Sequence, residues 1–125
     1  LIKNKKGHTL LAWRDDQYAG KGWHIPGGII RFKESINERI NEVARNEIGT
    51  LVDFYYPEPL AINEIFNHES ETRNHFISLL YKCSLPTTFV VKNKVLSKSN
   101  SGYLMWHKFC PNNLLKLKDI YRKYI

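Results

Sequence analysis

The sequence has little cysteine and no long apolar run, and both absences exclude whole classes of protein. Two cysteines, Cys83 and Cys110, among 125 residues are too few for a disulfide scaffold, and neither stands in a metal-binding Cys/His spacing. We interpret both as ordinary thiols of a reducing compartment and expect a cytoplasmic protein. No apolar stretch approaches the roughly 18 to 20 residues that a membrane-spanning helix needs. We therefore expect no membrane partner.

Repeats, low-complexity tracts and linkers are also absent, and we expect no signal peptide. The pattern predicts one domain over residues 1–125. The chain begins with Leu1 in place of Met, so we expect that a few N-terminal residues precede it. The sequence has an excess of positive charge: 19 Lys and Arg residues against 12 Asp and Glu give a formal net charge of +7. RNA, an anionic membrane surface and a small phosphorylated substrate all fit this excess.

The spacing of apolar residues predicts strands, a helix, more strands and a closing helix. Ser35 and Glu38 form a capping box, and apolar residues then recur at helical spacing until Gly49. Strands are predicted at residues 1–3, 8–14, 21–25, 51–56, 60–68, 75–83 and 103–109. An amphipathic helix follows Pro111. This order predicts an α/β or α+β fold with a central mixed β-sheet sandwiched between α-helices.

Glu47 is unusual because it falls on the apolar stripe of the central helix. At about 100° per residue it lies between Val43 and Ile40. A carboxylate facing a core is costly unless it is paired or bound to a metal, although at a helix end it can also reach solvent or an Arg. The other charged residues of this helix fall near the opposite, solvated face: Glu38, Arg39, Glu42 and Arg45.

The Gly27-Gly28 loop lies shortly before this helix. Such a loop can bring backbone carbonyl groups against a carboxylate of the helix, and oxygen donors of this kind suit Mg²⁺ or Mn²⁺. Glu34, just before the helix cap, is a second oxygen candidate. The alternative for Glu34 is an acid that simply stabilises the helix N-terminus.

Gly28, Glu34, Glu47 and Gly49 together resemble the Nudix box, Gly-x5-Glu-x7-Arg-Glu-U-x-Glu-Glu-x-Gly, where U is aliphatic. The spacing agrees without a gap. Three signature positions hold other residues: Glu42, Val43 and Asn46. The resemblance implies the Nudix fold with a depleted metal cluster.

Residues 2–49 are also similar to one Nudix branch, the GDP-mannose mannosyl hydrolases, which keep only the last helical Glu of the box. The matching segments are residues 9–14, 23–28, 66–68 and 74–76, roughly the first two-thirds of the chain. This branch has two arginines where the present sequence has Ile29 and Glu42. It breaks the bond between the sugar carbon and the diphosphate oxygen.

The resemblance implies roles for several residues. The carbonyl of Gly27 and the carboxylate of Glu47 would hold Mg²⁺, and Arg14 would contact the diphosphate. The metal-binding Gln and the general-base His of the branch fall at Asn100 and Ser101. Asn100 retains an oxygen donor, but Ser101 is a poor base.

Two histidines and two aromatic residues complete the candidate site. His68 and His75 are candidates for the general base, the role that histidine most often takes in catalysis, or they are ordinary surface imidazoles. Phe76 and Tyr103 are candidates for substrate binding, and the alternative for such aromatic residues is a place in the core.

We therefore expect a Mg²⁺-dependent hydrolase of a nucleoside diphosphate linked to another group, most like a GDP-sugar hydrolase. Two alternatives stay open: an ordinary nucleotide or dinucleotide pyrophosphohydrolase, and a Nudix-fold binding or regulatory module without catalysis. The expected partner is a small nucleotide or nucleotide sugar. RNA is suggested by charge alone, and a homodimer is an expectation because the related branch completes its site with a dimer partner.

Overall fold

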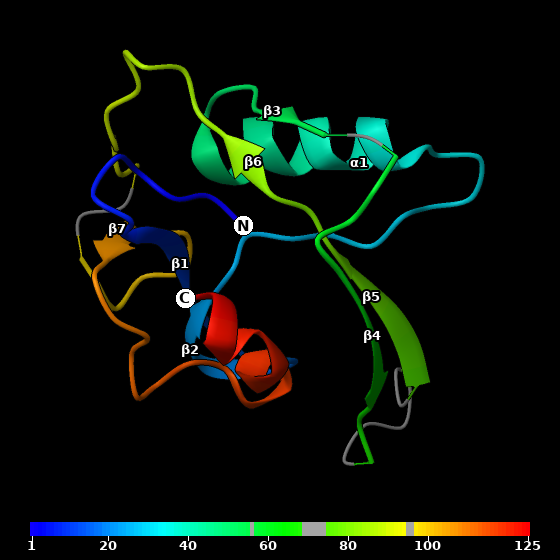
Figure 1. Ribbon diagram of the computed structural model, residues 1–125. Coiled ribbons are helices and arrows are strands. Elements are labelled where there is room, and N and C mark those ends of the chain that lie inside the picture. The colour runs from blue at the N-terminus through cyan, green and yellow to red at the C-terminus, as the bar shows by residue number, and fades with distance from the viewer. Residues whose placement is uncertain (56, 69–74, 95–96) are drawn as a thin grey trace.

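The computed structural model describes residues 1–125 except 56, 69–74 and 95–96 (Figure 1). The central helix is present as α1 (Ile36–Val43), which continues directly into a π-helical turn, η1 (Ala44–Ile48). A 3₁₀ helix, η2 (Lys116–Tyr124), closes the chain. The strands are β1 (Thr9–Asp16), β2 (Gly20–His24), β3 (Asp53–Phe54), β4 (Ala61–Phe66), β5 (His75–Leu80), β6 (Cys83–Ser84) and β7 (Leu104–His107).

Within the described residues these strands form three small antiparallel sheets, whereas we expected one central mixed sheet. The orders are β2-β1-β7, β3-β6 and β4-β5. Parallel pairing occurs in isolated bridges, which join Ile2 to Cys83 and Trp23 to Leu114. The two shortest strands, β3 and β6, each end before a proline, Pro57 and Pro86, and a proline has no N–H to donate to a longer ladder.

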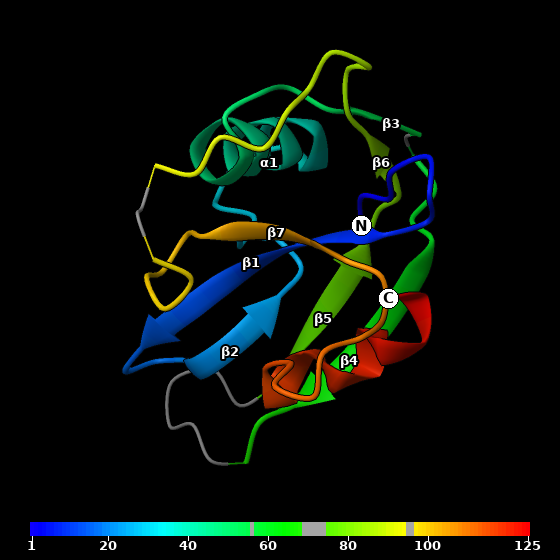
Figure 2. The ribbon, with the colours of Figure 1, turned by 90° about the vertical axis from the view of Figure 1, so that its left-hand side faces the viewer.

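The first five residues of β1 (9–13) are buried on both faces, and alternate side chains therefore enter two cores. The first core includes Leu10, Ala12, Ala44, Ile48, Val52 and Leu104. The second includes Leu11, Trp13, Trp23, Ile25, Leu80, Leu114 and Tyr121. Figure 2 shows α1 on one side of the β2-β1-β7 sheet and η2 on the other. The architecture is a mixed α and β fold in which helices cover both faces of a small sheet.

The central helix begins and ends at the residues that the sequence predicts. The Ser35 hydroxyl accepts a hydrogen bond from the Glu38 N–H, and the Glu38 carboxylate accepts one from the Ser35 N–H at 2.7 Å. At the other end Gly49 has a φ of +86°, in the left-handed region that favours glycine. The Gly49 N–H donates to the Ala44 carbonyl at 2.9 Å, and this five-residue span makes the last turn a π-helix.

The C-terminal helix starts later than predicted and is a 3₁₀ helix. Residues 113–115 run along β2, because the Trp23 N–H donates to the Asn113 carbonyl and the Leu115 N–H donates to the Trp23 carbonyl, each at 2.9 Å. Gly22 permits this approach, since a Cβ atom there would lie 2.6 Å from the Asn113 oxygen. One turn therefore follows Pro111, in which the Leu114 N–H donates to the Pro111 carbonyl, and the bridge to β2 delays the start of the helix to Lys116.

Other strand boundaries also differ from those that the sequence predicts. The predicted strand at residues 75–83 is divided, because the chain changes its pairing partner from β4 to β3 near Tyr81. The predicted strand at residues 51–56 is reduced to β3, and its last position lies outside the described residues. None of the helices in the described part of the chain is long and apolar enough to span a bilayer.

Candidate functional site

The loop after β2 and the helix pair α1–η1 enclose a pocket of about 580 Å³. The loop contributes residues 27–32, and the helices contribute Arg39, Val43, Asn46 and Glu47. Gly27 and Glu47, which we expected to meet, therefore line the same pocket. Glu47 is half-buried and lies in the π-helical turn, a departure from the α-helix that is frequent at functional sites.

Gly28 is a glycine because the helix passes directly against it. A Cβ atom at this position would lie 2.8 Å from Cγ2 of Val43 and 2.9 Å from Cδ of Arg39. Val43 consequently packs against the loop. The helix places Ile40, Ala44 and Ile48 in or against the first core, a narrower stripe than the sequence predicts.

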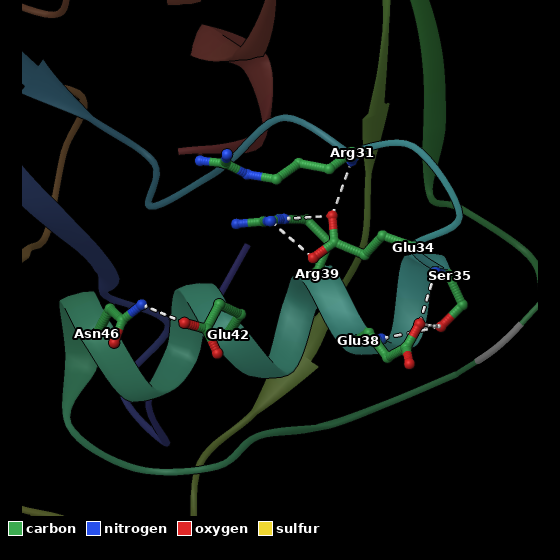
Figure 3. A network of polar contacts seen from close by, with 7 residues as sticks. All are labelled: Arg31, Glu34, Ser35, Glu38, Arg39, Glu42 and Asn46. Carbon is green, nitrogen blue, oxygen red and sulfur yellow. Dashed lines mark hydrogen bonds and ion pairs between the residues drawn. The ribbon is translucent and has the colours of Figure 1, made fainter.

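Glu34 is held by an arginine close to the pocket (Figure 3). Its two oxygens lie 2.6 and 2.9 Å from Nη2 and Nε of Arg39, and one of them also accepts a hydrogen bond from the Arg31 backbone N–H at 2.8 Å. These hydrogen bonds, above all those from Arg39, lower the pKa of Glu34. Glu34 lines a neighbouring pocket of about 430 Å³, so it does not join Gly27 and Glu47.

Arg14 and Asn100 lie at another edge of the molecule. Arg14, near the end of β1, is paired with the carboxylate of Asp16, and this hydrogen bond lowers the pKa of Asp16. The turn that contains Asn100 lies beside the same strand end, because the Asp15 N–H donates to the Ser101 hydroxyl at 2.8 Å. The Asn100 carbonyl accepts a hydrogen bond from Tyr103. Neither Arg14 nor Asn100 lines the pocket with Glu47.

His68 and His75 lie at the end of the β4–β5 hairpin. Nε2 of His75 is 2.8 Å from Oε1 of Glu64, and both imidazoles stack on Phe66, with ring centroids 4.3 Å away for His75 and 5.9 Å for His68. Figures 1 and 2 show this end of the hairpin pointing away from α1. Because the hairpin extends in that direction, neither histidine reaches the pocket.

The two aromatic candidates for substrate binding are also absent from the described wall of the pocket. Tyr103 is half-buried and packs against the second core, as the alternative for that residue predicts. Phe76 is half-buried on β5, paired with Ile65. Asn74, part of the segment that resembles the mannosyl hydrolases, lies outside the described residues.

The structure adds residues that we did not predict. Arg39 was expected on the solvated face of the helix, but its side chain is only 16% exposed and lies along the pocket. The spacing of Arg39, Val43 and Glu47 contains the signal, because residues four apart share a face of a helix. Arg31 and the 91% exposed Phe32 complete the loop side of the pocket.

The donor atoms suit a metal that arrives with a phosphorylated ligand. Among the described residues, no three His, Cys, Asp or Glu side chains gather closely enough to hold an ion. The pocket offers the Glu47 carboxylate and loop carbonyl groups such as that of Gly27. Mg²⁺ commonly binds through one or two carboxylates together with substrate phosphates, so one carboxylate is a sufficient protein contribution.

Comparison with known proteins identifies no relative. No protein-family model, curated protein or solved structure matches this chain. The fold and the site therefore define it as a mixed α and β protein with a charged pocket between a glycine loop and a helix, and the pocket carries the proposal of function.

Proposed function

We propose that this protein is a Mg²⁺-dependent hydrolase of the Nudix type that acts on a nucleoside diphosphate linked to another group, with a GDP-sugar as the first candidate. The observation that carries the proposal is the shared pocket of Gly27 and Glu47. These are the two residues that the Nudix resemblance assigns to the metal.

The pocket supports this chemistry in two ways. Its volume of about 580 Å³ falls within the usual range for small-molecule sites. The Glu47 carboxylate and the Gly27 carbonyl would hold Mg²⁺, which when bound neutralises negative charge that develops on a departing diphosphate. Phe32 presents an exposed aromatic surface at the pocket, suited to contact with a base or sugar.

A second candidate is a nucleotide-binding module without catalysis. Val43 and Asn46 stand where the Nudix box has glutamates, and the amide of Asn46 donates to Glu42 at 2.8 Å. Glu47 is consequently the one carboxylate among the described residues of the pocket wall. A site of this composition favours binding of an anionic ligand over assembly of a cluster of metal ions.

The experiment is an assay of nucleotide sugars, dinucleotides and nucleoside triphosphates with Mg²⁺, with wild type and Glu47→Gln compared. We expect a nucleoside diphosphate and free sugar as products, and a loss of kcat/KM on the order of 100-fold in Glu47→Gln. Glu42→Gln is the matched control, because Glu42 lies on the same helix but outside this pocket. Its activity should match wild type.

The products separate the candidates. In ¹⁸O-labelled water, label in the sugar indicates attack at carbon, and label in a phosphate indicates an ordinary pyrophosphohydrolase. Tight nucleotide binding without turnover of any substrate supports the binding module. If there is no turnover and Glu47→Gln leaves ligand affinity unchanged, the hydrolase proposal is wrong.

A further inference from the structure

Two arginines from different elements line the same pocket. Arg31 comes from the loop and Arg39 from α1, and Figure 3 shows their side chains extending in the same direction. The stem of Arg39 lies against Gly28, and Nε and Nη2 of Arg39 are held by Glu34. The position of the Arg39 guanidinium is therefore fixed before any ligand binds.

Both guanidinium groups keep donors for a ligand. Glu34 engages one edge of Arg39, and no hydrogen bond to another described residue is made by Nη1 of Arg39 or by the Arg31 side chain. An arginine presents several N–H groups in a planar fork that matches the oxygens of a phosphate. One fixed fork and one unengaged fork thus face one pocket.

The charges of the pocket wall also favour an anion. Among the described residues that line it, two guanidinium groups face the single carboxylate of Glu47. Glu34 forms an ion pair with Arg39, whereas the Arg31 guanidinium, whose charge Glu34 also attracts, forms no ion pair with a described residue. A ligand with two adjacent negative groups carries acceptors for two guanidinium groups, whereas a single phosphate carries fewer acceptors and less charge.

We propose that Arg31 and Arg39 bind the diphosphate group of the ligand, and that Glu34 is a positioning residue that holds Arg39 against Gly28. The identity of the ligand as a nucleoside diphosphate compound rests on the proposed function. Recognition of the diphosphate group itself requires only the two arginines and the pocket. The exposed Phe32 lies on the same wall, next to Arg31 in the chain, where it can contact the rest of the ligand.

The test is calorimetric titration with inorganic pyrophosphate and with GDP, at low salt and without metal. Wild type should bind pyrophosphate more tightly than inorganic phosphate. Arg31→Gln and Arg39→Gln should each lower pyrophosphate affinity about tenfold or more, as expected for the loss of a charge-assisted hydrogen bond. Arg45→Gln removes the same charge from an exposed position on the neighbouring helical turn, outside this pocket, and should change affinity less than about twofold.

Glu34→Gln tests the positioning role. If only net charge matters, removing this carboxylate strengthens anion binding. If Glu34 holds Arg39 in place, the variant binds pyrophosphate more weakly even though the pocket becomes more positive. Tighter binding by Glu34→Gln would therefore overturn the positioning role.

The outcomes distinguish this inference from the proposed hydrolase. Binding of pyrophosphate that depends on Arg31 and Arg39, without turnover of any substrate, supports the arginine pair and contradicts the hydrolase. Substrate turnover with an unchanged KM in both arginine variants contradicts the pair and leaves the hydrolase standing. An equal loss of affinity in Arg31→Gln and Arg45→Gln would show that pyrophosphate binding depends on the overall positive charge and not on these two arginines, and it would overturn the inference. Arg31→Gln is expected to fold, because the side chain is exposed and makes no hydrogen bond to the described chain.

Discussion

At the scale of single residues, the burial of His107 makes the stability of the fold depend on pH. The residue is 9% exposed on β7, and its ring packs edge-on against Trp23 with the centroids 4.4 Å apart. Nε2 of His107 is buried and has no hydrogen-bond partner among the described residues. Burial lowers the pKa of His107, because a charged imidazolium is poorly solvated there. The folded protein therefore favours the neutral ring.

This burial predicts that the protein loses stability in mild acid. The unfolded histidine titrates near pH 6.5 and the folded one below it, so between these values the unfolded state binds more protons. The free energy of unfolding should then decrease as the pH falls below about 6.5. His107→Phe keeps an aromatic ring against Trp23 and should reduce this decrease, measured by urea unfolding at about pH 5.5 and 7.5.

The exposed His68→Gln is the matched control for the removal of one histidine. An unchanged pH dependence in His107→Phe would contradict the role of His107.

At the scale of elements, the contact between the glycine loop and α1 carries a stability prediction. Gly28→Ala would place Cβ 2.8 Å from Val43 and 2.9 Å from Arg39, so the loop or the helix must move. We expect a loss of about 1–3 kcal/mol in the free energy of unfolding, as for other overpacked contacts. Pyrophosphate binding should weaken as well, because the added Cβ would displace the Arg39 side chain that we propose binds the diphosphate.

Gly27→Ala is the control for this substitution. Its nearest contact would be 3.7 Å, an ordinary van der Waals distance, so stability should change by less than about 0.5 kcal/mol. Chemical denaturation of both variants gives the comparison, and equal destabilisation would show that the close contact at Gly28 is not the cause.

Local signals explain which elements the sequence predicts well. The Ser35–Glu38 box and Gly49 act within a few residues, and both are present in the structure. The C-terminal helix depends on a distant partner instead. Leu114 forms a bridge with Trp23 because β2 offers backbone hydrogen bonds to residues 113 and 115 over Gly22, and nothing in the local pattern encodes that pairing. The spacing of apolar residues indicates that a segment is buried, but it does not indicate which other segment packs against it.

The same distinction applies to the candidate site. Gly27 and Glu47 were predicted to meet because the glycine loop leads directly into the helix that carries Glu47 and because the Nudix resemblance assigns both to the metal, and both line one pocket. The positions of Arg14, Asn100, His68 and His75 depend on how separate strands are arranged, which the local pattern does not contain. Arg39 was missed for another reason: we assigned it to the solvated face with the other charged residues, although it is four residues before Val43 and so shares a face of the helix with Val43 and Glu47.

At the scale of the whole molecule, the strands differ in how they are held. Strand β1 pairs with a strand on each side, and its first five residues are buried on both faces. Strands β4 and β5 pair with each other, and Ile62, Phe66 and Ile77 on this hairpin are more than half exposed. Amides that are paired and buried on every side exchange mainly through global unfolding, whereas an element with an exposed face can open locally.

We therefore predict that the β4–β5 hairpin opens without unfolding β1. In hydrogen–deuterium exchange, amides of β1 should be the slowest, and those of β4 and β5 should exchange sooner. The hydroxyl groups of Ser78 and Tyr121 form a hydrogen bond that connects β5 to η2, so Tyr121→Phe should accelerate exchange in β5 and leave β1 unaffected. If β4, β5 and β1 exchange at one rate, and Tyr121→Phe shifts them together, the hairpin belongs to the same cooperative unit as the central strand and the prediction is wrong.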